Sequence, residues 1–259
     1  MKIGIIGAGR VGTSFGKLLY EHNLLSGFYD TIPPSFGYPV FKTKEELCEN
    51  SDVIFITVPD DKIKVVWDEI KHMCENKTVC HMSGAMSAQD AFPNFEKRVS
   101  LHPMMAVSNS DATEELKNAQ FSIEGTAVKE IKEAFSFLNI REIDSDKKAL
   151  YHASCVFASN LMQALVEIGI DNLTKCGFNK DEGIKALEKL TEANIKNIFE
   201  KGVFESLTGP VARNDIETVK KHLEVLHGDD KEIYKLLSKK LTYIAESNGD
   251  YTQMRKELM

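Results

Sequence analysis

The sequence lacks several features that mark large classes of proteins. Its five cysteines form no Cys-x-x-Cys pair, so no disulfide framework is indicated and the thiols are expected to be reduced. A net charge of −7 disfavours nucleic acid as a partner, because phosphate binding needs a basic face. No apolar run approaches the roughly 20 residues that span a bilayer. We therefore expect a cytoplasmic protein that binds neither nucleic acid nor a membrane.

The composition that remains is that of an ordinary globular protein. Hydrophobic residues make up 42% and charged residues 27% of the 259 positions. A chain of this length can bury a full core without disulfides or a structural metal, in one large domain or two ordinary ones. A strand expected from Lys2 onward also leaves no room for a signal peptide.

The first half of the chain alternates apolar strands with amphipathic helices. The segment 52–58 is nearly all apolar and rich in branched side chains, which is typical of a central parallel strand buried on both faces. His102 and Pro103 are expected to stop the strand before them. Strands are predicted at 2–6, 27–30, 52–58, 78–82, 99–101, 121–124 and 142–144. This alternation predicts an α/β fold, a doubly wound parallel Rossmann sheet with helices on both faces.

The second half is predicted to be helical throughout. One long helix without proline is expected over 149–176, and Gly177 closes it. Asn179, with Glu182 three residues later, resembles a capping box that opens the next helix.

The change in character sets the predicted domain boundary near residue 145. A dinucleotide-binding Rossmann domain is expected at 1–145, followed by an all-helical substrate and dimerisation domain at 146–259. The tail 249–259 is expected to fray or to pack on a partner.

A glycine turn directly after the first strand carries the strongest functional signal. The first glycine allows a tight turn, the second lets the backbone approach a pyrophosphate, and the third lets the helix pack on the strand. The turn consists of Gly7, Ala8, Gly9, Arg10, Val11 and Gly12. It predicts a bound nicotinamide dinucleotide, with its phosphates at the positive end of the helix. Arg10 either contacts a phosphate or is a solvated surface charge.

Asp30 lies 23 residues after Gly7, at the end of the second predicted strand. A carboxylate there accepts hydrogen bonds from the ribose hydroxyls of NAD and repels the 2′-phosphate of NADP. We therefore expect NAD or NADP as cofactor, with NAD favoured. The alternative is an aspartate that only caps a turn.

With these residues identified, the chain resembles a known family. Its motifs are Gly7–Gly12, Thr57–Asp61, His81–Ala85, Leu101–Pro103, Ile123–Gly125, Tyr151–Ser154, Ala158–Asn160 and Leu207–Pro210. In this order they resemble Rossmann-like proteins with the C-terminal domain of unknown function 2520, distant relatives of pyrroline-5-carboxylate reductase and the 3-hydroxyacid dehydrogenases. The resemblance implies an oxidoreductase whose helical domain often dimerises. Relatives often carry Arg-Gly-Asp after the last motif, where this chain has Arg213-Asn214-Asp215, and NADP-binding relatives usually have Ser or Arg near Asp30.

Three segments are expected at the carboxyl ends of strands, where ligands bind in open α/β sheets. Val58, Pro59 and Asp60 are predicted to border the nicotinamide ribose. Ser83 and His102 are predicted to face the nicotinamide or the substrate. Taken singly, each segment also fits ordinary loop chemistry, since proline and glycine stop strands and aspartate caps helices.

The long helix is expected to supply the other wall of the site. At about 100° per residue, His152, Ser159 and Gln163 lie within roughly 40° of one another, with Asn160 about 80° from His152. His152 is a candidate proton donor, although a lone helical histidine is often structural. The 3-hydroxyacid dehydrogenases use a lysine one turn before an asparagine, and Val156 occupies that position here, so His152 or His102 would replace it.

Arg213 follows the Leu-Thr-Gly-Pro loop and is a candidate clamp for a substrate carboxylate. The alternative is an exposed arginine balanced by Asp215. The leading hypothesis is thus an NAD(P)-dependent oxidoreductase for a small carbonyl or imine compound that bears a carboxylate.

Two other functions remain open at this point. One is a dinucleotide-binding sensor or regulator without chemistry, which the missing lysine favours. The other is a zinc site formed by His81, His102 and His152, although they lack ligand spacing and no metal is expected. The expected partners are a small-molecule substrate and a second copy of the chain, bound through the helical domain.

Overall fold

The computed structural model describes residues 1–34 and 37–259, which form two compact units, Met1–Ser159 and Asn160–Met259. The predicted boundary near residue 145 marks the end of the sheet, whereas the units divide at the end of the following helix. The first unit is an α/β layer structure and the second is helical, so the predicted fold class is confirmed.

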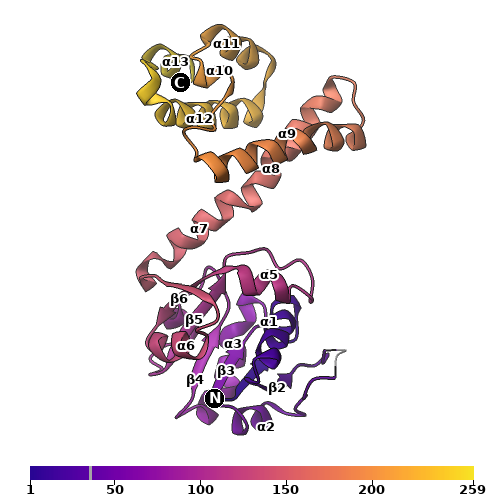
Figure 1. Ribbon diagram of the computed structural model, residues 1–259, viewed down its shortest axis with the longest axis vertical. Coiled ribbons are helices and arrows are strands. Elements are labelled where there is room, and N and C mark those ends of the chain that lie inside the picture. The colour runs from indigo at the N-terminus through magenta and orange to yellow at the C-terminus, as the bar shows by residue number, and fades with distance from the viewer. Residues whose placement is uncertain (35–36) are drawn as a thin grey trace. The chain divides into compact units, whose positions relative to one another are not determined.

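The first unit is built on one seven-stranded sheet in the order β2-β1-β3-β4-β5-β6-β7 (Figure 1). All neighbouring strands are parallel except β5 and β6, which pair antiparallel. The strands are β1 (Ile3–Ile6), β2 (Leu25–Tyr29), β3 (Val53–Ile56), β4 (Thr78–His81), β5 (Arg98–Pro103), β6 (Gln120–Gly125) and β7 (Asn139–Glu142). The carboxyl ends of β1, β3, β4 and β5 therefore lie in a row along one edge of the sheet.

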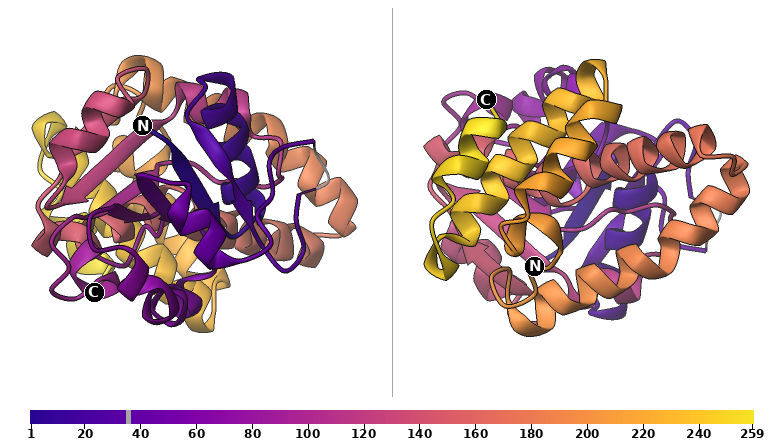
Figure 2. Two further views of the ribbon diagram at one scale, coloured as in Figure 1. Left: turned by 90° about the horizontal axis from the view of Figure 1, so that it is seen from below. Right: turned by 90° about the horizontal axis from the view of Figure 1, so that it is seen from above.

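Helices cover both faces of this sheet (Figures 1 and 2). One apolar core joins it to α1 (Arg10–Glu21), α5 (Thr113–Asn118) and α6 (Val128–Ala134). The other core joins it to α2 (Lys44–Glu49), α3 (Asp60–Ile70) and α4 (Ala88–Ala91). Successive strand residues alternate between the two cores, with Phe55 in the first and Ile54 and Ile56 in the second, as the pleat requires.

The predicted end of the fifth strand was wrong. His102 and Pro103 do not stop this strand but belong to β5, where they pair with Ser122 and Phe121 of the antiparallel β6. Proline is tolerated there because an antiparallel ladder asks for an amide hydrogen at only every second residue on each side. His102 consequently projects from a rigid strand rather than from a loop.

The predicted single helix over 149–176 is interrupted. The structure has α7 (Lys148–Ala158) and α8 (Asn160–Lys175), with Ser159 between them at φ −126° and ψ −81°. The Ser159 hydroxyl donates to the Cys155 carbonyl at 2.7 Å, a local side-chain bond that competes with the regular helical pattern. The angular spacing expected for a continuous helix therefore does not extend from His152 past Ser159.

The second unit combines a helical hairpin with a small core. Helix α9 (Lys180–Lys201) follows α8, and its capping box of Asn179 and Glu182 is formed as predicted. The later helices are α10 (Gly209–Ala212), α11 (Ile216–Val225), α12 (Gly228–Ile244) and α13 (Thr252–Glu257), with a 3-10 turn at Glu246–Asn248. The first unit has 3-10 turns at Lys71–Met73 and Ser145–Lys147. Contrary to the prediction, the tail is not frayed, because Tyr251, Met254 and Leu258 are buried in this core.

Among the described residues one helical segment, Ser145–Lys175, is long and apolar enough to cross a membrane, since it contains an 18-residue window with a mean hydropathy of 1.4. The prediction that no apolar run approaches that length was therefore wrong. A core helix of a soluble protein meets the same criteria of length and composition. Its first part also belongs to the α/β unit, where the Lys148 ammonium donates to the Ser100 hydroxyl of β5 at 2.8 Å.

Candidate functional site

The glycine turn has the geometry that a diphosphate needs. Gly7 has φ +107°, a conformation that favours glycine. A Cβ on Gly12 would lie 2.0 Å from the Gly7 carbonyl oxygen, so α1 packs against the turn only without a side chain there. A Cβ on Gly9 would meet nothing within 4 Å, and no side chain caps the amino end of α1. Exposed amide hydrogens at an uncapped helix start therefore fit the phosphates of a dinucleotide.

Asp30 lies directly after β2 and holds the glycine turn from the side. One carboxylate oxygen accepts the Ala8 amide, and the other accepts the Ile32 amide at 2.9 Å and the Thr31 hydroxyl at 3.2 Å. These bonds are those expected of an aspartate that caps a turn. The carboxylate can still accept further hydrogen bonds, such as those from the ribose hydroxyls of a dinucleotide. The exposed Arg10 guanidinium donates to the Ser108 carbonyl at 3.3 Å.

The loops after β3 and β4 are joined to each other. Asp60, the first residue of α3, accepts a hydrogen bond from the Ser83 hydroxyl at 2.7 Å. The same Ser83 oxygen accepts the Met86 amide at 3.0 Å, so the loop that follows β4 is held closed. Val58 is half-buried and Pro59 is exposed at the start of α3, beside the Gly7 turn. Ser83 is therefore committed to loop structure through its own hydroxyl.

Two histidines converge on Gly84 in that loop. A Cβ built on Gly84 would lie 2.5 Å from His152 Nδ1 and 2.7 Å from His102 Nε2. Only a residue without a side chain therefore lets both imidazoles pack this closely against the loop that follows β4. His152 Nδ1 is buried and has no hydrogen-bond partner in the described part of the chain. The structure thus brings His102 and His152 together, although one comes from β5 and the other from α7.

A buried lysine lies behind this pair. Lys148 is 2% exposed, and burial lowers the pKa of its ammonium to about 8, while Glu124 acts in the opposite direction. Burial and the Lys148 charge lower the pKa of His102 to about 4. Both causes also lower the pKa of the fully buried His81 to about 3. The two imidazoles are consequently neutral at pH 7.

The remaining buried groups in this region serve the scaffold. Glu124, 1% exposed, accepts the Ala88 amide and the Ser145 hydroxyl, at 2.7 and 2.6 Å. His81 Nδ1 accepts the Ser83 amide at 3.1 Å. Across residues 1–34 and 37–259, no three His, Cys, Asp or Glu side chains are grouped to hold a metal. The zinc arrangement considered from the sequence is therefore not formed in the described residues.

Several predicted site residues belong to the second unit or to its border. Asn160 and Gln163 are exposed on α8, and Ser159 ends the first unit. Arg213 is exposed after α10; Thr218 lowers the pKa of Asp215 by hydrogen bonding, and the Arg213 charge adds to this effect. Their roles at a ligand stay predictions.

Sequence reasoning missed Lys148 and Tyr151. The position one turn before Asn160, where the resemblance implies a lysine, is Val156, whereas Lys148 lies one turn before His152. Tyr151 was part of a recognised motif but was given no role, although its hydroxyl lies 2.7 Å from His102 Nδ1. The spacing of Lys148, Tyr151 and His152 on one helical face was the available signal.

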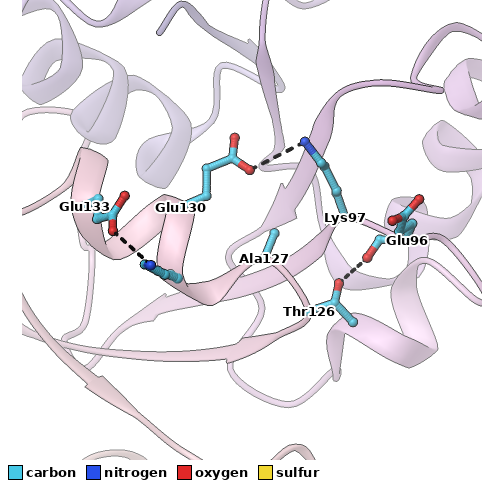
Figure 3. A pocket seen from close by; sticks show the side chains of 7 residues that line it. Glu96, Lys97, Thr126, Ala127, Glu130 and Glu133 are labelled. Carbon is cyan, nitrogen blue, oxygen red and sulfur yellow. Dashed lines mark hydrogen bonds and ion pairs between the residues drawn. The ribbon is translucent and has the colours of Figure 1, made fainter.

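Two cavities flank the sheet away from the glycine turn. One, of about 620 Å³, lies where β5 begins and β6 ends. Its lining includes Glu96, Lys97, Lys129, Glu130 and Glu133, and Figure 3 shows Lys97 paired with Glu130. An excess of carboxylates makes it a poor site for a diphosphate. The other, of about 490 Å³, is lined by Met104, Gln120, Ser122, Asn139, Ile140, Arg141, Ile143 and Tyr151.

Two family profiles match the chain in succession. Residues 2–83 match the family described as NADP oxidoreductase, coenzyme F420-dependent, and residues 119–241 match the domain of unknown function 2520. No curated protein matched the sequence.

Solved structures with the same fold cover nearly the whole chain. A Thermotoga maritima protein is 24% identical, with a TM-score of 0.76 over 95% of this chain and 99% of its own. Plasmodium falciparum pyrroline carboxylate reductase with NADP bound is 15% identical, with a TM-score of 0.58 and coverage of 95% and 98%. An imine reductase from Myxococcus stipitatus in complex with NADP⁺ is 14% identical, with a TM-score of 0.57 and coverage of 96% and 94%.

These identities establish a shared fold, and the two profiles establish the domain composition. The chain therefore has the fold of Rossmann-type proteins, and its two parts are similar to an NADP oxidoreductase family, over residues 2–83, and to the domain of unknown function 2520, over residues 119–241.

Proposed function

We propose that this protein is an NAD(P)-dependent oxidoreductase that transfers hydride to or from a small carbonyl or imine compound. The observation that carries the proposal is the meeting of His102 and His152 at Gly84, in the loop that follows β4. This point lies at the carboxyl edge of the sheet, in the same row of strand ends as the glycine turn. Structural relatives include a pyrroline carboxylate reductase and an imine reductase, both with NADP.

The chain's own residues divide into holding and reacting groups. Gly7, Gly9 and Gly12 hold the diphosphate, and the loop at Val58–Asp60 borders the nicotinamide ribose. The bound nicotinamide supplies or accepts the hydride. His102 and His152 bind the reacting oxygen or nitrogen, and hydrogen bonds from both stabilise the charge that develops there. The roles that the sequence predicts for Arg213, Ser159, Gln163 and Asn160 in binding a carboxylate-bearing substrate stay predictions.

NAD is the proposed cofactor because the residue that directly follows β2, Asp30, carries a negative charge. A 2′-phosphate placed near Asp30 meets a negative charge that is already fixed by the Ala8 amide. Replacing Asp30 by Ser is expected to raise the ratio of NADPH to NADH affinity at least tenfold, measured by fluorescence titration. An unchanged ratio would refute the proposed preference.

The hairpin of α8 and α9 is proposed to pair with a second copy of the chain. Within α8 and α9 only Ile170 and Gly183 are buried, and Leu161, Leu165 and Phe199 remain exposed, the last by 85%. Two helices form a single layer that cannot bury apolar side chains on both of its sides. Two such hairpins, one from each copy, form a four-helix bundle.

Gly84→Ala provides the direct test of the histidine pair. The new methyl group would force both imidazoles to move, while the glycine turn is untouched. We expect NADH affinity to stay within twofold and turnover of 2-oxo acids, aldehydes or cyclic imines, followed at 340 nm, to fall at least 100-fold. His152→Ala is expected to reduce the rate beyond any loss of affinity.

Two matched glycine variants complete the experiment. Gly183→Ala places a methyl group 3.4 Å from Ile170, an ordinary contact, and should change nothing. Gly9→Val leaves the fold intact, because its position is open, but blocks the diphosphate. The proposal fails if neither NADH nor NADPH binds the wild type, or if Gly84→Ala turns over substrate normally. Binding without any turnover in the screen would favour the dinucleotide sensor instead.

A further inference from the structure

A row of polar side chains crosses the last three strands of the sheet. His102 lies opposite Ser122 in the β5–β6 ladder, and Ser122 lies opposite Arg141 in the β6–β7 ladder. Residues paired in this way point to the same face of a sheet, with their Cβ atoms about 5 Å apart. The neighbours of Ser122 in β6, Phe121 and Ile123, belong to the apolar core on the other face. The three polar side chains therefore lie side by side on the face that α7 contacts.

Two members of this row line a cavity. Ser122 and Arg141 border the cavity of about 490 Å³, and Tyr151 of α7 lines it as well. A volume of this size lies in the range of pockets that hold small molecules. The Tyr151 hydroxyl lies 2.7 Å from His102 Nδ1, so the wall of the cavity is in contact with the histidine pair of the candidate site. The lining residues all belong to the first unit, which therefore forms the cavity by itself.

The Ser122 hydroxyl is a buried polar group that the protein does not satisfy. Ser122 is 1% exposed, and its side-chain oxygen has no hydrogen-bond partner within residues 1–34 and 37–259. A buried hydroxyl without a hydrogen bond is unfavourable, and nearly all such groups in folded proteins have a partner. Because Ser122 lines the cavity, a ligand bound there can supply that partner.

The charges around the cavity favour an anion. Arg141 is the charged residue among those described that line the cavity, and no acidic side chain is among them. The adjacent Glu142 points to the other face of β7 and pairs with Lys132 at 3.9 Å, so it does not neutralise Arg141. Burial raises the pKa of Tyr151 to about 12, so its phenol is uncharged at pH 7 and does not repel an anion. An anionic ligand therefore meets one guanidinium and no opposing carboxylate in the described lining.

We propose that this cavity binds a small 2-amino or 2-hydroxy acid. The Arg141 guanidinium and the Ser122 hydroxyl donate to its carboxylate, which gives the buried hydroxyl its acceptor. Gln120 recognises the second functional group. Its amide nitrogen donates to the Phe121 and Asn139 carbonyls at 3.0 and 2.9 Å, which leaves its side-chain oxygen to accept from the amino or hydroxyl group of the ligand. Gln120 and Ser122 are two residues apart on β6, about 7 Å along the strand, a separation that such an acid spans with one hydrogen bond at each end.

Binding can be measured on the full chain without a dinucleotide. Met104 and Ile143 also line the cavity, so the probes are aliphatic 2-amino and 2-hydroxy acids, each paired with its own amide, which lacks the carboxylate. The five arginine Nε–H signals are followed by ¹H–¹⁵N NMR, and Arg141→Gln assigns the signal of Arg141. We expect at least one acid to shift that signal with a saturable dependence on concentration and its amide to leave the signal in place. The proposal is overturned if no acid shifts it, or if acids and amides shift it equally.

Variants separate a binding role from a structural one. Calorimetry is expected to show at least a tenfold loss of affinity for the acid in Arg141→Gln and about a fivefold loss in Ser122→Ala. A Ser122→Ala protein that binds the acid normally and only unfolds at higher urea would show that the hydroxyl serves no ligand, and would overturn the proposal. Lys129→Gln is the control, because it removes a positive charge that is 91% exposed in the same unit and should leave the affinity unchanged. An equal loss in Lys129→Gln, or a loss in Arg213→Gln with none in Arg141→Gln, would also overturn it.

Kinetics distinguishes the two sources of such an acid, a substrate of the proposed reaction and a separate effector. If the acid is a substrate, Arg141→Gln raises its KM at least tenfold and changes kcat little, because the carboxylate is bound alike in the ground and transition states. If it is an effector, it changes the rate with another substrate without competing with that substrate, and Arg141→Gln abolishes the change. Either result supports the site. If no dinucleotide binds, the proposed function fails, and the NMR titration still decides whether the cavity holds an acid.

Discussion

Lys148→Met tests whether the ammonium is as desolvated as the structure indicates. Burial lowers the pKa of Lys148 from an ordinary 10.5 to about 8. At 1.36 kcal/mol per pKa unit, this corresponds to about 3 kcal/mol by which the folded state disfavours the protonated form. Lys148 is 2% exposed, so solvent screening does not reduce this value strongly.

The sign of the pH dependence follows from proton counting. Between pH 8 and 10.5 the unfolded chain keeps the Lys148 proton, whereas the folded chain has lost it. The unfolded state then binds more protons, so the free energy of unfolding rises with pH across this window. The wild type should gain about 3 kcal/mol from this group, most of it by pH 10, and should gain none below pH 8. Lys148→Met should lack this rise.

Trp67 provides the assay. It is the single tryptophan of the chain and is buried in the first unit, so its fluorescence reports urea unfolding of the unit that holds Lys148. Unfolding curves are compared at several pH values from 7 to 10. Lys129→Met is the control, because the Lys129 side chain is 91% exposed and its removal should leave the wild-type slope intact. Parallel curves for wild type and Lys148→Met would refute a desolvated ammonium.

Three further variants test packing, capping and assembly. Gly16→Ala should destabilise the first unit by about 1–3 kcal/mol in urea unfolding, because its Cβ would lie 2.1 Å from the Phe28 ring; an unchanged midpoint would contradict this packing. Asn179→Ala removes the capping box with Glu182 and should lower the unfolding free energy of the second unit by about 1 kcal/mol, measured by circular dichroism. Leu165→Glu should convert the proposed dimer to a monomer in sedimentation velocity, and a wild type that already sediments as a monomer would refute the pairing.

The main features of the fold could be predicted because local and global signals agree in this chain. Apolar runs such as 53–56 become central strands, and the positive φ of Gly7 follows from the turn that the glycine pattern predicts. The errors lie where a tertiary contact or a single side-chain bond decides the outcome. Pro103 stays in a strand because β6 pairs antiparallel with it, and the helix that composition alone would continue is broken where the backbone of Ser159 leaves the helical conformation.

The candidate site was harder to predict because it is assembled across the sheet. His102, Gly84 and His152 come from a strand, a loop and a helix, and only their distances reveal a shared point. Lys148 was harder still to find, since a lysine at the start of a helix is ordinarily a surface charge. Its burial depends on Ser100, which β5 presents to α7 only after the sheet has formed. Chemistry that depends on a charge held away from water is therefore set by the tertiary fold, and sequence spacing alone cannot reveal it.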